Sequence, residues 1–204
     1  MNNIGRAFSF MFEDKGWLGK IVIGGLFCLL SLVVVGIPFV FGYMLEMAKR
    51  SSENKEIPLP EWDNLGDKFI RGLIYFVILI IYSLPGLILY FIPCIGSFCL
   101  GPLWWLVVLF VTPYITVKYS LTGNFGDAFQ FNEIVNFIKL NFTNVFIVVL
   151  MSIALSVISH FGVLLLVVGI FFAWFWAILG ISYLYGQLYS VAQKAEVKPV
   201  SSQT

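Results

Sequence analysis

The single histidine of the chain, His160, and the serines beside it come closest to the residue types and spacing of a catalytic or metal site. A metal site needs three or four ligands, and a serine nucleophile needs a group that orients the imidazole and an oxyanion hole. Around Ser156, Ser159 and His160 the sequence offers no nearby carboxylate. We therefore expect a turn residue that touches water or headgroups, with a proton-sensitive or metal site as the alternative. The sequence predicts no catalytic, metal or cofactor-binding residue and no enzymatic activity.

The segment Ile57–Asn64 is a candidate for interaction rather than catalysis. Its prolines favour an extended backbone, which would let Trp62 dip into a membrane interface while Glu61 and Asp63 stay in water. We interpret this segment as a tethering linker, and a recognition surface is the alternative.

The segment Asp127–Phe142 is the second candidate, because its pattern is that of an amphipathic helix. Phe131, Ile134, Val135, Ile138 and Phe142 share one face at helical spacing. We expect this helix to lie in the headgroup layer, and a partner-docking helix is the alternative. The candidate interaction residues of the two segments are Pro60, Glu61, Trp62, Asp63, Asn132, Glu133, Asn136 and Lys139.

The elements that must position these residues follow from the distribution of charge. All charged side chains fall in four blocks, and the stretches 21–45, 72–117 and 140–193 carry none. The chain is 60% hydrophobic and 11% charged, whereas soluble domains average about 25% charged residues. A transmembrane helix needs about 20 apolar residues, so each of the two longer stretches can hold two crossings and a turn. The net charge of +1 argues against a nucleic-acid surface.

We expect an all-α integral membrane protein, a six-helix bundle built from three helical hairpins with interfacial amphipathic helices. A single transmembrane domain would cover 1–204, with a flexible tail at 194–204. The expected helices are 17–36, 38–50, 70–92, 102–119, 144–161 and 165–190, with Gly and Pro at the turns.

The second helix is the least certain element, because only 38–45 is strictly apolar before Glu46. It could be a short buried helix or part of a re-entrant hairpin. The rival interpretation is one helix across 21–45, which gives five crossings. Cys94 and Cys99 flank the second turn and could pair, but three cysteines favour free thiols.

A short phrase, Asn-apolar-Gly-x-x-Phe, occurs at Asn3–Phe8, Asn64–Phe69 and Asn124–Phe129. Its near-constant spacing suggests repeat units 1–63, 64–123 and 124–193. In the second and third copies an Asp stands three residues after the Asn, which predicts capping of a helix N-terminus.

The orientation follows from the lysines and arginines. With three hairpins they all lie on one side, and the turns on the other side carry no charge. The positive-inside rule then predicts a multi-pass cell-membrane protein with both termini and both long loops in the cytoplasm. The five-helix alternative would export Arg6, Lys15 and Lys20.

Several of these residues together resemble a known family. The run Gly42–Glu46, the pair Lys49–Arg50, the sequence Leu59–Asp63 and Gly72 resemble a prokaryotic family known as domain of unknown function 4013, and Tyr183–Tyr189 is similar to its C-terminal signature. The resemblance covers nearly the whole chain. It implies a small prokaryotic integral membrane protein, and it implies no activity and no functional residues.

Two functions from different classes remain. The first is a non-enzymatic membrane scaffold that binds lipid, a protein partner or a second copy of itself through its cytoplasmic loops, where the polar residues are concentrated. The second is a transporter or pore for a small or apolar solute, because transporters often contain internal repeats, and helices broken at Pro85 and Pro113 could line a path. The lack of charged residues in the apolar stretches is evidence against this second hypothesis. A cavity between the helices would favour it, and a solid bundle would favour the scaffold.

Overall fold

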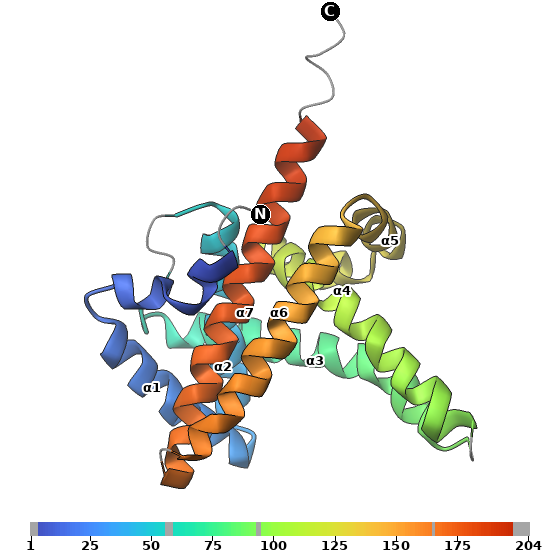
Figure 1. Ribbon diagram of the computed structural model, residues 1–204. Coiled ribbons are helices and arrows are strands. Elements are labelled where there is room, and N and C mark those ends of the chain that lie inside the picture. The colour runs from blue at the N-terminus through green and yellow to red at the C-terminus, as the bar shows by residue number, and fades with distance from the viewer. Residues whose placement is uncertain (1–3, 56–58, 93–94, 165, 198–204) are drawn as a thin grey trace, which may run out of the picture.

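The computed structural model describes residues 4–55, 59–92, 95–164 and 166–197, and this part of the chain is helical, with no strand (Figure 1). Its seven α-helices are α1 (Trp17–Leu30), α2 (Gly36–Ser52), α3 (Leu65–Tyr90), α4 (Gly101–Thr122), α5 (Phe131–Leu140), α6 (Phe142–His160) and α7 (Leu166–Val197). The shorter helical segments are η1 (Ile4–Phe8), η2 (Phe10–Glu13), η3 (Ser31–Val33), η4 (Gly96–Leu100), η5 (Phe125–Phe129) and η6 (Phe161–Leu164). Each of the six long helices expected from the sequence has a counterpart, and α5 is the seventh.

In the described part of the chain, four helical stretches are long and apolar enough to cross a membrane: Leu65–Tyr90, Gly96–Thr122, Phe142–His160 and Gly169–Ala195. In the first three, most residues are not buried within the protein. Apolar side chains such as Leu84, Leu106 and Phe146 are exposed. Exposed apolar surface of this extent is unusual for a protein that faces water, so these helices suggest a membrane protein.

Residues 21–45 form two helices rather than one. α1 ends at Leu30, the chain reverses through η3 and Val34, and α2 begins at Gly36. Val34 adopts the left-handed backbone conformation, with φ of 68°. A β-carbon on Gly36 would meet the carbonyl oxygen of Phe27, so the reversal is too tight for a larger residue. The rival interpretation of a single helix across 21–45 is therefore wrong.

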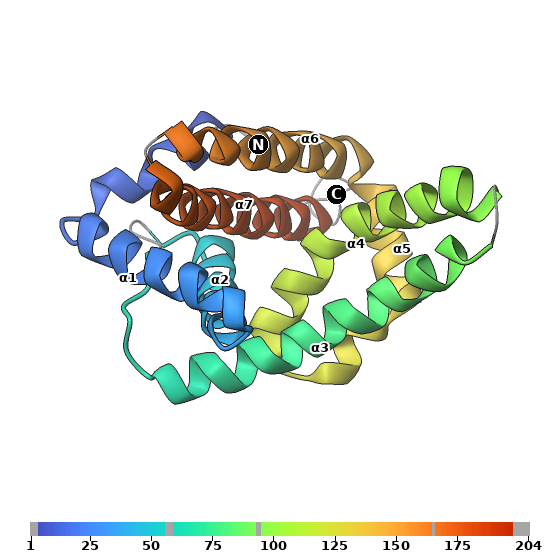
Figure 2. The ribbon, with the colours of Figure 1, turned by 90° about the horizontal axis from the view of Figure 1, so that it is seen from below.

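α2 is the central helix of the packing. It contacts α1, α3, α4 and α7, and Figure 2 shows it between α7 and α3. The crossing with α3 is close because a β-carbon on Gly72 would meet the backbone of Pro38, and one on Gly42 would meet the backbone of Lys68. Gly186 has the same role where α2 meets α7. Small residues of this kind let helix backbones approach in the absence of a hydrophobic drive from lipid.

α3 and α4 form a pair whose far ends extend away from the other helices (Figures 1 and 2). Both are continuous through an internal proline, Pro85 in α3 and Pro113 in α4. The predicted breaks at these prolines are therefore wrong. The indole N–H of Trp104 in α4 donates to the carbonyl oxygen of Tyr82 in α3, at 2.8 Å, and joins the two helices near Pro85.

The expected amphipathic helix over 127–142 is shorter than predicted. η5 ends at Phe129, and α5 runs from Phe131 to Leu140. Its buried residues are Ile134 and Phe137, whereas Phe131 and Val135 are exposed. The sequence pattern correctly indicated a helix with an apolar face, of which Ile134 packs into the protein while Phe131 and Val135 lie at its surface.

The predicted caps have two outcomes. The side-chain oxygen of Asn124 accepts a hydrogen bond from the amide of Gly126, at 3.2 Å, so a cap forms before η5. Asn64 precedes α3 with a left-handed backbone, φ of 45°, and its side chain caps nothing. Of the two cysteines that could pair, Cys99 carries a free thiol, and Cys94 lies outside the described residues.

Candidate functional site

Trp62 lies at the centre of a cluster of aromatic rings contributed by three helices. Its ring centroid is 4.4 Å from that of Tyr43, 4.9 Å from that of Phe27 and 5.8 Å from that of Phe175. The indole N–H donates to the carbonyl oxygen of Lys20 at 2.9 Å. The ring therefore packs against α1, α2 and α7 and fastens the loop before α3 to them.

The residues before Trp62 strengthen this attachment. Leu59 and Pro60 are buried. The hydroxyl of Tyr43, in α2, donates to the carbonyl oxygen of Pro60 at 2.8 Å. We refer to Leu59–Asp63 as the clasp, because these five residues join α1, α2, α3 and α7.

An ion pair lies on each side of Trp62. Glu61 binds the ammonium group of Lys20 at 2.6 Å, and Asp63 binds that of Lys68 at 3.0 Å. Both lysines are buried, with 9% and 4% of their side-chain surface exposed. The hydrogen bond from Lys68 lowers the pKa of Asp63, so this carboxylate stays ionised well into the acid range.

Each buried lysine also has a second carboxylate partner. Lys20 binds Asp14 at 2.7 Å, and Lys68 binds Glu46 at 2.9 Å. Burial raises the pKa of Asp14, but the hydrogen bonds from Lys20 and from the Gly16 amide outweigh this effect and leave the pKa lowered. A buried cation is tolerated when it is paired and hydrogen-bonded, and both lysines meet this condition.

The second set of predicted residues lies on α5. Asn132, Glu133, Asn136 and Lys139 are all exposed. The hydroxyl of Tyr114 and the ammonium group of Lys118, both in α4, donate to the Glu133 carboxylate at 2.8 Å each.

Glu133 and Asn136 also line a pocket of about 310 Å³ between α4, α5 and α7, to which Asn132 and Lys139 do not contribute. The hydrogen bond from Lys118, with that from Tyr114, lowers the pKa of Glu133. None of the four α5 residues lines the same pocket as the clasp.

A charged pocket of about 360 Å³ lies where the end of α2, the start of α3 and the end of α4 meet. Asp63 of the clasp contributes to it, and Tyr119 and Ser120 come from α4. The charged side chains that line it are Glu46, Lys49, Arg50, Lys55, Asp63, Asp67, Lys68 and Arg71. Apart from Asp63, these residues were not among the predicted interaction residues, although the adjacent pair Lys49–Arg50 was a signal that could have identified them.

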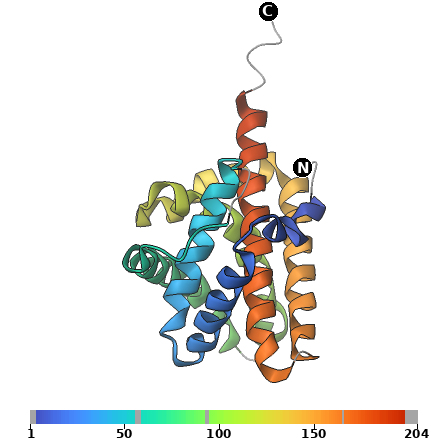
Figure 3. The same cartoon turned by 90° about the vertical axis from the view of Figure 1, so that its left-hand side faces the viewer.

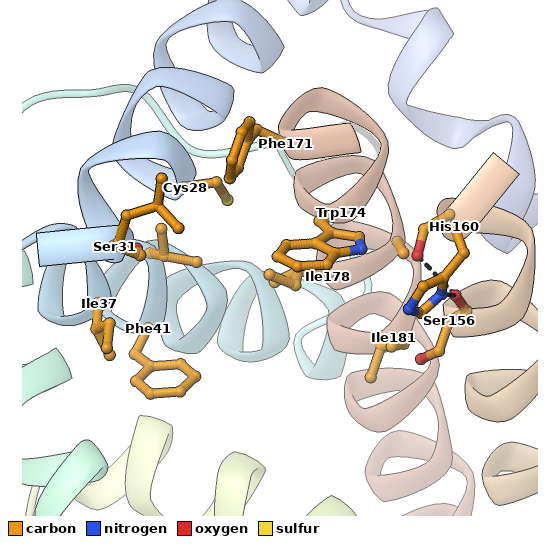
Figure 4. A pocket seen from close by; sticks show the side chains of 14 residues that line it. Cys28, Ser31, Ile37, Phe41, Ser156, His160, Phe171, Trp174, Ile178 and Ile181 are labelled. Carbon is orange, nitrogen blue, oxygen red and sulfur yellow. Dashed lines mark hydrogen bonds between the residues drawn. The ribbon is translucent and has the colours of Figure 1, made fainter. Parts of the chain in front are cut away.

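An apolar cavity of about 360 Å³ lies between α1, α2, α6 and α7 (Figure 4). Cys28, Phe41, Trp174, Ile178 and Ile181 are among its lining residues. Sequence periodicity gave no sign of this cavity, because it depends on how four helices cross.

His160 lines one edge of the apolar cavity. It is the last residue of α6, it is exposed, and its Nδ1 lies 2.6 Å from the carbonyl oxygen of Ser156. The hydroxyl of Ser159 donates to the same carbonyl at 2.7 Å. His160 is therefore bonded to a main-chain oxygen rather than to a serine hydroxyl. Among the described residues, no group of three His, Cys, Asp or Glu side chains lies close enough together to hold a metal ion.

Comparisons with known proteins give a family and no activity. The family described as protein of unknown function, DUF4013, matches residues 23–173, which is most of the chain. An uncharacterized protein of Methanocaldococcus jannaschii is 28% identical over 138 residues, which cover 58% of this chain and 47% of that protein. The chain thus spans about half the length of this relative. No solved structure matches the chain. The matched range includes the clasp, which carried the resemblance, and it ends before the Tyr183–Tyr189 run. The chain belongs to the DUF4013 family.

Proposed function

We propose that the protein is a multi-pass protein of the cell membrane, with α1–α2, α3–α4 and α6–α7 as three transmembrane hairpins and both termini in the cytoplasm. The arrangement of the helices supports this proposal. In Figure 1 the C-terminal end of α7 lies at the upper end, and the reversals between α1 and α2 and between α6 and α7 lie at the lower end. Figure 3 shows the same arrangement from the side, with α6 and α7 side by side. The first hairpin is the shortest, because α1 with η3 falls below the length of the four membrane-length stretches.

We further propose that the protein has no enzymatic activity and acts as a scaffold that binds anionic lipid at this cytoplasmic face. The observation that carries the proposal is the clasp, which holds the segment before α3 rigidly against three other helices and completes a charged pocket beside it. A preformed pocket on a rigid support binds a small polar group better than a loosely held surface does. A protein partner would instead use the exposed polar residues of α5.

The lipid preference of the purified full-length chain tests this function. Native mass spectrometry after equilibration with equal amounts of phosphatidylglycerol and phosphatidylcholine would count the retained lipids. We expect phosphatidylglycerol to be retained in excess, and the excess to shrink as salt is raised, because screening weakens exposed charge interactions. Equal retention of both lipids at low salt would contradict the proposal.

The apolar cavity supports a second candidate function, transport of a small apolar solute. Hydrocarbon side chains of four helices line it, and the side chains of Ser31 and Ser159 hydrogen-bond to carbonyl oxygens of their own helices. Apolar cavities of this kind accept apolar ligands. Figure 4 shows the side chain of Ile178 in the lining, so Ile178→Trp would fill part of the space.

Flux of apolar solutes through liposomes that contain the protein separates the two functions. Transport predicts flux above that of empty liposomes and a reduction of several-fold in Ile178→Trp. No flux across several solute classes would leave the scaffold as the better function.

A further inference from the structure

The charged pocket contains sets of residues that neutralise one another. Arg50 donates to Glu46 through two nitrogens, at 3.1 and 2.7 Å. Lys68 binds both Glu46, at 2.9 Å, and Asp63, at 3.0 Å. These two cations and two carboxylates form one connected network with no net charge.

Three further cations line the pocket. Arg71 pairs with Asp67 at 3.0 Å, and Lys55 pairs with Glu53 at 2.8 Å. Lys49 is half-buried and has no ion-pair partner within the described part of the chain. Among the described residues, the pocket with its paired residues therefore has an excess of one positive charge, and that charge belongs to Lys49.

The start of α3 adds hydrogen-bond donors to the same pocket. The first amides of a helix have no acceptor within the helix and carry a partial positive charge. Here the side chain of Asn64 caps none of them, and the carboxylate of Asp67 is engaged by Arg71. Asn64, Asp67 and Lys68 all line the pocket, so this end of α3 contributes to its wall.

We propose that this pocket binds a phosphodiester, with its single negative charge matched to Lys49 and its oxygens directed at the first turn of α3. The volume of about 360 Å³ is within the usual range of about 300–1,000 Å³ for small-molecule pockets. The source is the headgroup of an anionic lipid, because α3 and α4, which end at the pocket, have membrane length and the pocket then lies at headgroup depth. This inference rests on the proposed lipid-binding function and assigns it a site.

The test compares two substitutions that each remove one positive charge with a third that leaves the charge unchanged. Lys49→Gln removes the unmatched cation, Lys49→Arg retains it, and Lys15→Gln removes an exposed cation outside the pocket. Retention of phosphatidylglycerol by each full-length variant is counted by native mass spectrometry. One basic residue near an anionic headgroup contributes about 1 kcal/mol, so we expect Lys49→Gln to lower retention roughly fivefold. Lys49→Arg and Lys15→Gln should stay close to wild type.

Equal effects of Lys49→Gln and Lys15→Gln would overturn the site and leave the lipid-binding function in place. A wild-type protein with no preference for phosphatidylglycerol would instead refute the function itself. Inorganic phosphate and glycerol 3-phosphate provide the soluble arm of the test. If either anion at low millimolar concentration displaces phosphatidylglycerol from wild type but fails to displace it from Lys15→Gln, surface charge rather than the pocket binds the lipid. If either anion binds more tightly than the lipid, the phosphate group that the pocket binds comes from a soluble anion.

Discussion

Replacement of Trp62 by alanine tests whether the clasp holds the helices together. The substitution removes contacts with three aromatic rings and the hydrogen bond to the carbonyl oxygen of Lys20. Truncation of a large aromatic side chain in a core costs about 3–5 kcal/mol, and because Trp62 is only half-buried we take about 3 kcal/mol. For a chain of this size, about 1 kcal/mol shifts the unfolding temperature by roughly 2–4 °C, so we expect a fall of roughly 6–12 °C.

The assay heats the protein in detergent and measures the fraction that remains monodisperse by size-exclusion chromatography. Trp62→Phe is the matched control, because it keeps an aromatic ring in the cluster and loses only the indole hydrogen bond, worth about 1 kcal/mol. Its unfolding temperature should fall by roughly 2–4 °C. An unchanged unfolding temperature in Trp62→Ala would refute this reasoning and would favour a loop that is free to insert Trp62 into the membrane interface.

Two glycines of α3 predict opposite effects of the same substitution. Gly72→Ala would place a β-carbon against the backbone of Pro38 and should lower the unfolding temperature. Gly66 has open space around it, so Gly66→Ala should leave the free energy of unfolding unchanged or raise it by up to about 1 kcal/mol. Equal effects of the two substitutions would mean that α2 and α3 are not in close contact. The hydrogen bond from Lys118 lowers the pKa of Glu133 from its ordinary value of 4.5. The ionised Glu133 carboxylate therefore stabilises the fold fully when the pH is above its pKa in the unfolded chain, and this stabilisation is lost as the pH falls through its lower pKa in the folded protein. Unfolding temperatures measured from pH 6 to pH 3 should therefore fall more steeply in wild type than in Glu133→Gln, and parallel curves would show that this carboxylate does not support α5.

The helices could be predicted from the sequence because charge is costly in hydrocarbon. The gaps between charged residues gave α3, α4, α6 and α7 to within a few residues at most ends. The first gap was ambiguous, because only 38–45 is strictly apolar before Glu46, which is too short to cross a membrane. The chain turns at Val34, which adopts a left-handed backbone that no propensity favours for a β-branched residue.

The position of Trp62 could not be predicted, because its partners come from three separate helices. Phe27, Tyr43 and Phe175 meet only after α1, α2 and α7 have packed. A local pattern of Pro, Glu, Trp and Asp fits equally well with a membrane-inserted loop and with a clasp. Periodicity within one segment carries no information about which of these long-range contacts form.

The burial of two lysines also could not be predicted from the sequence. Lys20 and Lys68 count as solvated charges in any composition argument, yet each is buried between two carboxylates. Their partners Glu61 and Asp63 flank Trp62, so the ion pairs depend on the same packing as the aromatic cluster. On α5, Phe137 rather than Phe131 is buried because it packs against the ring of Tyr114, with 4.9 Å between centroids.

Three transmembrane hairpins would place every long loop and both ends of the chain on one side of the membrane. Cysteine labelling measures this placement: single cysteines at Lys55, at Lys194 and at Ser97, each in a chain without its own cysteines, are treated with an impermeant reagent in intact and in inverted vesicles. We expect the cysteines at Lys55 and Lys194 to react from the cytoplasmic side and the one at Ser97 to react from the opposite side. Reaction of the cysteines at Lys55 and Lys194 from different sides would contradict the three-hairpin arrangement.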